Sequence, residues 1–222
     1  VSSMTADCVA RLRRASARAH DLLRHVHEPT PGLNWARNRG LRESRGEIVA
    51  YTDDDVRVDA QWLHGLQRGF ADASIELVTG LVVPAELETD AQVIFEDFYG
   101  GMGKGMQSGV LRSTETHAHP RLGAHHVGVG ANLAFRRQWL HVLGGFDTAL
   151  DVGTASQGGG DIDIIFRSLA AGGAARYEPS ALVHHHHRRE MHALRRQLRD
   201  NGRAFGVYLL TRWSRQEERR LD

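Results

Sequence analysis

Strand-like apolar runs alternate with amphipathic helical segments through this chain, and the alternation constrains the fold more than any other feature. Apolar residues recur with a period of about 3.6 in segments that we predict to be helical, at 34–45, 60–71, 137–143 and 161–171. Short apolar runs between them are predicted to be strands, at 47–52, 77–83, 127–135, 177 and 181–183. This order favours an α/β fold with a predominantly parallel sheet covered by helices on both faces.

Three further segments complete the interpretation. Residues 5–25 are predicted to be helical, and the Gly- and His-rich stretch 100–127 is predicted to be an irregular, mobile loop over a site. A second flexible loop is predicted at 153–160, where glycines again cluster before a helical segment.

The chain after Arg188 is predicted to be a long Arg-rich helix, and we divide the chain into a domain at 1–187 and a basic amphipathic segment at 188–222. Gly202 and Gly206 argue against one uninterrupted helix, because glycine disfavours helix interiors. We expect this helix to pack on the edge of the domain. The alternative is peripheral attachment of its basic face to an anionic membrane surface.

Composition excludes several classes of protein. The formal net charge of +1 over 222 residues gives no reason to expect a nucleic-acid partner. A single cysteine, Cys8, excludes a disulfide framework and fits a reducing compartment. No apolar stretch approaches the roughly 20 residues that span a bilayer. A cytoplasmic location is therefore expected.

Three consecutive carboxylates follow the first predicted strand, at Asp53, Asp54 and Asp55. Ligands of open α/β sheets bind beyond the carboxyl ends of strands. Mg²⁺ is commonly shared between one or two protein carboxylates and the phosphates of a substrate. The triplet therefore indicates a metal–diphosphate site, although an acidic loop or a helix start has the same composition.

A second acidic pair lies where a glycine-rich loop becomes a helix, in the sequence GGGDIDIIFR. Asp161 at this junction could point into a cleft and accept a proton from an attacking hydroxyl, with Asp163 two residues on. Gly159 and Gly160 leave room for a bulky partner to approach the backbone. The alternative is a helix N-cap, for which Asp is a preferred residue.

Four consecutive histidines follow the last predicted strand. Alternate side chains share one face of a strand, so His185 and His187 would point together and His184 and His186 the other way. One imidazole could complete the coordination of a metal held by Asp53 and Asp55. Surface histidines without a ligand role are the alternative.

A basic motif, PGLNWARNRGL, opens the helix predicted at 34–45. Arg37 and Asn38 lie in its first turns, where backbone N–H groups and a cation can meet a phosphate. Arg37 could equally be a solvated surface charge.

These motifs occur in the order ARNRG, YTDDDV, GVGANLAFRR, GGFD, GGGDID and HHHHRR, and with them residues 28–213 resemble glycosyltransferase family 2. The resemblance implies a GT-A fold, with a nucleotide-sugar-binding, mostly parallel sheet flanked by helices. It implies inverting transfer from a nucleotide-sugar donor to a glycan, lipid or other hydroxyl acceptor.

The resemblance also assigns roles to single residues. Asp53 and Asp55, with His185, would hold Mg²⁺ or Mn²⁺, and Asp161 would be the catalytic base. Gly160 stands where relatives often have Glu. Donor binding would involve three residues, Arg37, Asn38 and Asp54. Acceptor binding would involve four, Asn132, Gly159, Gly160 and Asp163.

The strand–helix–strand unit that opens this family is not recognisable, so we expect an N-terminally incomplete glycosyltransferase with a C-terminal Arg-rich helix. Two other functions stay open. One is a non-catalytic relative that binds a glycan or a partner, and the other is a metal-dependent phosphoester hydrolase.

Overall fold

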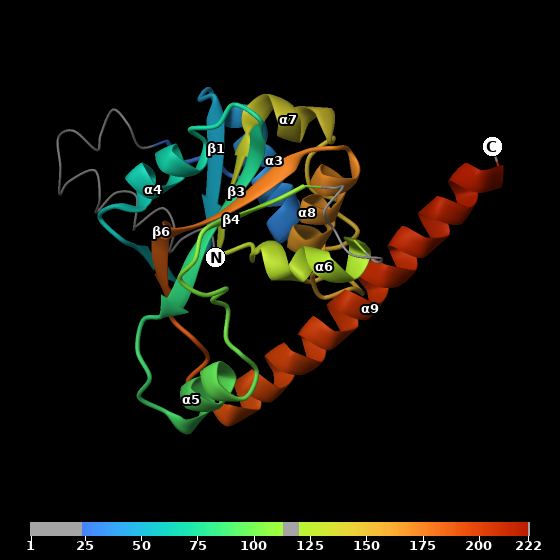
Figure 1. Cartoon of the computed structure of the whole chain (residues 1–222). Coiled ribbons are helices and arrows are strands. Elements are labelled where there is room, and N and C mark those ends of the chain that lie inside the picture. Colours follow the sequence, from blue (N-terminus) through green and yellow to red (C-terminus); the bar gives the residue numbers. More distant parts are fainter. Residues whose placement is uncertain (1–23, 113–119, 222) are drawn as a thin grey trace.

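The structure is a computed structural model that describes residues 24–112 and 120–221 (Figure 1). The helix predicted at 5–25 lies almost wholly outside these residues. The described helices are α3 (Leu33–Glu43), α4 (Trp62–Gly69), α5 (Asp90–Asp97), α6 (Pro120–Val127), α7 (Arg137–Val142), α8 (Gly160–Ala170) and α9 (Met191–Leu221). The described strands are β1 (Ile48–Thr52), β2 (Val56–Val58), β3 (Ile75–Pro84), β4 (Gly109–Leu111), β5 (Asn132–Arg136) and β6 (Ala174–His185).

The sheet is mixed, and the prediction of a mostly parallel sheet was wrong. The strand order is β1-β5-β3-β6-β2, with β4 also paired to β6. Within the described part of the chain, β3 and β6 form the single parallel ladder. Alternating strands and helices give parallel neighbours only when each connection returns the chain to the same end of the sheet. β5 enters from the opposite end between β1 and β3, so both of its ladders are antiparallel.

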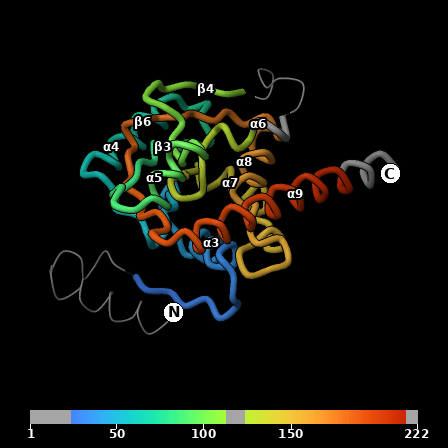
Figure 2. Tube along the Cα trace, turned by 90° about the horizontal axis from the view of Figure 1, so that it is seen from below, coloured from blue at the N-terminus to red at the C-terminus, as the bar shows by residue number. Residues whose placement is uncertain are grey.

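Helices cover both faces of this sheet, as the sequence predicted. On one face, Leu66 and Phe70 of the α4 region pack against Val78. On the other, α3, α7 and α8 contribute to a larger cluster that contains Leu77. Leu77 and Val78 are successive residues of β3, and successive strand side chains point to opposite faces. Figures 1 and 2 show α4 on the side of the sheet opposite to α7 and α8.

The segment 100–127 is more regular than predicted. It contains β4 and helix α6, whose Ala124 and Val127 are buried in the larger core cluster. The two short β segments predicted around residues 177–183 belong to one 12-residue strand, β6. Glycine and histidine are common in loops, but here tertiary packing overrides that local preference.

Helix α9 runs uninterrupted for 31 residues, so the expected interruption at Gly202 and Gly206 was wrong. Each glycine disfavours the helix by only about 1 kcal/mol, and packing compensates. Leu194 packs on α5, and Tyr208 contacts the Phe166 ring of α8. Figure 1 shows α9 running obliquely from α5 past α8. Among the described residues, no helix is long and apolar enough to cross a membrane.

Candidate functional site

The acidic triplet forms the turn between β1 and β2, and two ladders fix its ends. Thr52, at the end of β1, pairs with Asn132 at the start of β5. Val56, at the start of β2, pairs with His185 at the end of β6. These registers bring the chain before β5 and the histidine run against the same short turn.

Arg37 links the triplet to the segment that precedes β5. Its Nη2 lies 3.4 Å from Asp53 Oδ1 and 3.5 Å from the Gly130 carbonyl oxygen. The guanidinium also lies over the Phe146 ring, 5.3 Å from the centroid. Arg37 is 8% exposed, so its alternative interpretation as a solvated surface charge was wrong.

Asp161 lies on the other side of Gly130. The Gly130 N–H donates to Asp161 Oδ2 at 2.9 Å, and the Ile162 N–H donates to Oδ1 at 2.9 Å. A Cβ on Gly130 would lie 2.6 Å from Arg37 Nη2 and 3.2 Å from Asp161 Oδ2. The structure thus brings the two predicted acidic clusters together, with a glycine between them that leaves no room for a side chain.

The charges of this site affect one another. Burial raises the pKa of the Asp53 carboxyl above its ordinary value; the Arg37 guanidinium opposes the shift, and the carboxylates of Asp55 and Asp161 add to it. Three carboxylates that repel one another across a shared space favour a bound cation.

His185 is the imidazole nearest to the triplet, as predicted. Its Nε2 lies 3.3 Å from Asp55 Oδ1, and burial is the main cause that lowers its pKa. His187 shares its side, as predicted from strand alternation, and the two rings lie 5.0 Å apart. His186 instead meets Glu86, at 2.8 Å.

These donors fit a divalent cation in part. Within the described residues, no group of three His, Cys, Asp or Glu side chains is already arranged to hold a metal ion. Asp55 and His185 are however adjacent, and Mn²⁺ accepts both carboxylate oxygen and imidazole nitrogen. Two protein ligands suffice where substrate phosphates supply the others, so the residues present fit a cation that arrives with a diphosphate.

Two residues predicted to bind the sugar acceptor already have intramolecular partners. The Asn132 side chain is fully buried, where its amide donates to the Leu81 and Ala181 carbonyls. The Asp163 carboxylate is fully buried and pairs with Arg167 and Arg212, each at 2.7 Å. The polar atoms of both side chains therefore already have intramolecular partners, and their place near an acceptor stays a prediction.

Asn38 and the start of α3 are likewise engaged. The first-turn N–H groups of Leu33 and Asn34 donate to the Asp151 carboxylate, at 2.9 and 2.7 Å. Both polar atoms of the Asn38 amide bond to the backbone of Phe146, at 2.8 Å. We expected a phosphate to bind at this helix start, but the Asp151 carboxylate already takes the place of that anion.

Gly159 and Gly160 form the start of α8. Gly159 has a φ of +96°, and a Cβ on Gly160 would overlap the Asn34 side chain. Gly160 allows the close approach of α8 to α3, whereas Gly159 lies against Ala204 and Tyr208 of α9. Asp54 is exposed at the turn and lies nearer to solvent than its neighbours.

Sequence reasoning missed residues that shape the site. Gly130 carried a local signal, since glycines flank Val129 just before a strand. Glu96 lies on α5, which was not predicted although Thr89 and Gln92 form a capping box at its start. Asp151 and Arg212 gave no signal, because their partners lie far along the chain.

Comparison with known proteins identifies relatives. The family model described as glycosyl transferase family 2 matches residues 2–144. The chain is 29% identical over 180 residues to the pre-mycofactocin glycosyltransferase of Mycobacterium tuberculosis, covering 81% of this chain and 33% of that protein. It is 25% identical over 136 residues to the glucosyl-dolichyl phosphate glucuronosyltransferase of Haloferax volcanii, covering 58% and 38%. The chain thus spans about a third of the length of these curated relatives.

One solved structure shows the same kind of fold. The mannosyltransferase PcManGT from Pyrobaculum calidifontis, solved in complex with GDP-Man and Mn²⁺, superposes with a TM-score of 0.51 at 22% identity. The match covers 81% of this chain and 44% of that one. The α/β fold expected from the sequence is therefore confirmed, with a mixed sheet in place of a mostly parallel one.

Proposed function

Because this chain belongs to glycosyltransferase family 2, we propose that it transfers a sugar from a nucleotide-sugar donor to a hydroxyl acceptor, with inversion at the anomeric carbon. One observation supports the proposal above the others. The turn that carries Asp53 and Asp55 and the helix start that carries Asp161 meet at one site, joined through Arg37 and Gly130.

Asp161 takes the proton of the acceptor hydroxyl in this proposal. Its carboxylate is held by two backbone N–H groups, one through each oxygen, and each oxygen keeps a further lone pair for a hydroxyl. A positioned carboxylate of this kind contributes about 10²–10⁴-fold to a rate as a general base. The fixed orientation means that little reorganisation is needed when the acceptor binds.

Asp53, Asp55 and His185 face the diphosphate of the donor. They would hold Mg²⁺ or Mn²⁺, which offsets the charge that accumulates on a departing nucleoside diphosphate. Arg37 lies beside Asp53, where its guanidinium keeps that carboxylate in place and adds a positive charge near the leaving group. Asp54, exposed at the same turn, is a candidate contact to the donor.

The experiment is a nucleoside-diphosphate release assay over a panel of nucleotide sugars with Mn²⁺ and candidate acceptors. We expect Asp161→Asn to lose at least about 100-fold in turnover, because an amide cannot accept the hydroxyl proton. Donor affinity, measured by calorimetry, is expected to stay near that of the wild type.

Asp97→Asn is the matched control for charge in the same assay, since Asp97 is an exposed carboxylate on α5 with no role assigned in transfer. Transfer by Asp161→Asn at a rate close to the wild type would show that Asp161 is not the base. Release of inorganic phosphate from phosphoesters without a sugar acceptor would favour the hydrolase alternative instead.

A further inference from the structure

A chain of side-chain contacts runs from the acidic turn into helix α5. His185 Nε2 faces Asp55 Oδ1 at 3.3 Å, and His185 Nδ1 faces His187 Nδ1 at 3.0 Å. His187 Nε2 then faces Glu96 Oε1 at 2.7 Å. Three contacts therefore connect two carboxylates through two imidazoles.

The protons of this chain can be placed by counting. Two neutral imidazoles carry two N–H groups between them, whereas the three contacts would need three. The carboxylates can only accept, so one contact must remain without a proton. The shortest contact, between His187 and Glu96, is the costliest to leave as two facing acceptors.

A proton on His187 Nε2 leaves the Nδ1 of that ring as an acceptor. A proton on His185 Nδ1 then makes the 3.0 Å contact between the rings, whereas a proton on His185 Nε2 would leave two ring lone pairs facing each other at that shorter distance. The Nε2 of His185 is left with a bare lone pair, facing Asp55 across the longest contact of the chain. The reverse order would place two lone pairs 2.7 Å apart at Glu96.

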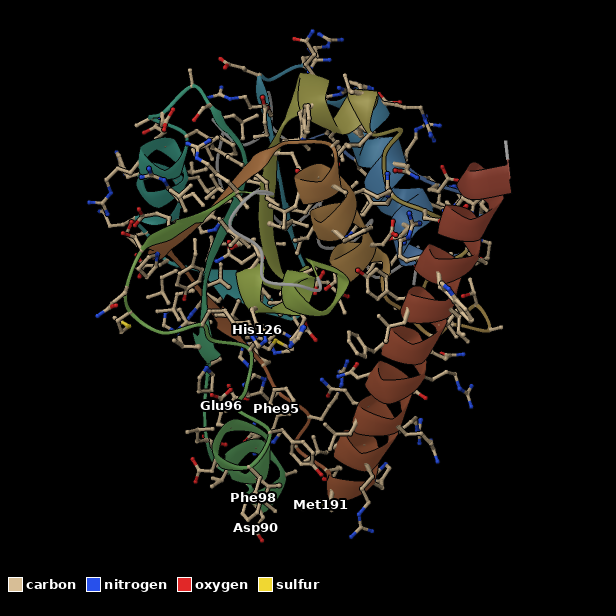
Figure 3. All side chains as sticks on the ribbon, turned by 45° about the vertical axis from the view of Figure 1, so that its right-hand side comes forward. Asp90, Phe95, Glu96, Phe98, His126 and Met191 are labelled. Atoms are coloured by element: carbon tan, nitrogen blue, oxygen red, sulfur yellow. The ribbon has the colours of Figure 1, made fainter. Side chains whose placement is uncertain are left out.

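Neighbouring side chains hold His187 and Glu96 in place. His187 is 5% exposed, and the edge of the Phe95 ring packs on it at 4.8 Å between centroids. Figure 3 shows Glu96 and Phe95 on the part of α5 nearer the sheet, and Phe98 and Asp90 farther from it. Helix α5 is fixed in turn by its capping box and by Leu194 of α9.

We propose that Glu96 and His187 are positioning residues, which hold His185 in the tautomer whose Nε2 lone pair faces Asp55, ready to bind a divalent cation. This inference rests on the cation site proposed above. A ligating histidine commonly donates its other ring N–H to a fixed acceptor, which sets its tautomer and orientation. Here the acceptor is a second histidine, and the group that sets the order is the Glu96 carboxylate on helix α5.

The tautomer is tested in the metal-free protein by long-range ¹H–¹⁵N correlation of ¹⁵N-histidine-labelled chain. Spectra are recorded at about pH 8, above the usual imidazole pKa. The His185 signals are assigned by their loss in His185→Ala. We expect the proton of His185 on Nδ1 in the wild type. Glu96→Leu removes the acceptor and is expected to shift His185 toward the Nε2–H form.

Binding of Mn²⁺ to the same variants in the presence of a nucleoside diphosphate, followed by electron paramagnetic resonance, gives the second readout. Loss of such an outer partner typically weakens metal affinity about 10–100-fold, and we expect Glu96→Leu to fall in that range. Glu96→Gln keeps an oxygen acceptor and should retain the wild-type tautomer and most of the affinity. Asp97→Leu is the matched control, because Asp97 is the exposed neighbour on the same helix.

Two results would overturn the inference. One is a wild-type spectrum with the His185 proton on Nε2, and the other is a loss of Mn²⁺ affinity in Glu96→Leu with no change of tautomer. A wild-type protein that shows the expected tautomer but binds no Mn²⁺ together with a nucleoside diphosphate would contradict the proposed cation site and leave the proton order standing.

Discussion

Arg37 has hydrogen-bond partners on two separate elements, the Asp53 carboxylate in the turn after β1 and the Gly130 carbonyl before β5. A single buried guanidinium therefore links the turn after β1 to the segment before β5, whose Gly130 N–H binds Asp161. Arginine suits this position because its donors have a rigid, planar arrangement that a lysine does not offer. At the scale of the residue, the site depends on close approach as much as on charge.

Gly130→Ala tests this close approach. The added methyl would lie 2.6 Å from Arg37 Nη2, so the guanidinium or Asp161 must move away. We expect transfer activity to fall about 100-fold, as a displacement of roughly 1 Å can cause. Gly40→Ala, where an added Cβ meets nothing within 4 Å, is the matched control. Unchanged kinetics in Gly130→Ala would show that this spacing is not critical.

Helix α9 lies at the next scale, that of the element. The two glycines that led us to expect an interruption, Gly202 and Gly206, have open space where a Cβ would be. They lie in the same continuous helix as the buried side chains of Leu194 and Tyr208. Its continuity is therefore a consequence of tertiary packing, which most helices need for stability.

Gly202→Ala combined with Gly206→Ala should stabilise the protein. Each substitution removes backbone freedom from the unfolded chain and meets no neighbour in the folded one, so we expect about 0.5–1 kcal/mol from each. The measurement is the free energy of unfolding in urea. Gly160→Ala, which would overlap Asn34, is the contrasting variant and should destabilise. A loss of stability in the double variant would indicate that the glycines have a packing role.

At the scale of the whole molecule, one buried and one partly exposed ion pair connect the C-terminal helix to the domain that carries the site. Arg212 of α9 reaches Asp163 of α8 at 2.7 Å, and Arg215 reaches Asp147 at 2.8 Å. Asp163 lies two residues after Asp161, so α9 stabilises the same helical turn that presents the proposed base. The favoured prediction, in which this helix packs on the domain, is supported by these contacts.

Arg212→Met should cost about 3–5 kcal/mol of unfolding free energy, because it leaves the Asp163 carboxylate buried without one of its partners. Arg215→Met is the matched control: its side chain is 44% exposed, and an exposed pair contributes under about 1 kcal/mol. The free energy of unfolding of both variants is measured by urea denaturation and compared with that of the wild type. Equal, small losses would show that the buried pair contributes no more than a surface one.

The sequence by itself determined the family and the larger helices and strands, whereas β2, β4, α5 and α6 were not predicted. Asp53, Asp55 and His185 could be placed near one another because strand ends and residue alternation are local properties of the chain. The order of motifs then indicated the glycosyltransferase family, which the family model matches. The same local signals could not reveal strand direction, since β5 is buried on both faces and has the continuous apolar pattern that is typical of a parallel strand.

Only the tertiary structure decided which polar side chains remain free for ligands. Asn38, Asn132 and Asp163 have residue types that suit a binding site, yet their partners are backbone or arginine groups distant in sequence. Glu96 lies 91 positions from His187 and still receives its hydrogen bond. Such contacts form when the folded chain brings remote segments within hydrogen-bond distance, and no local pattern encodes that distance.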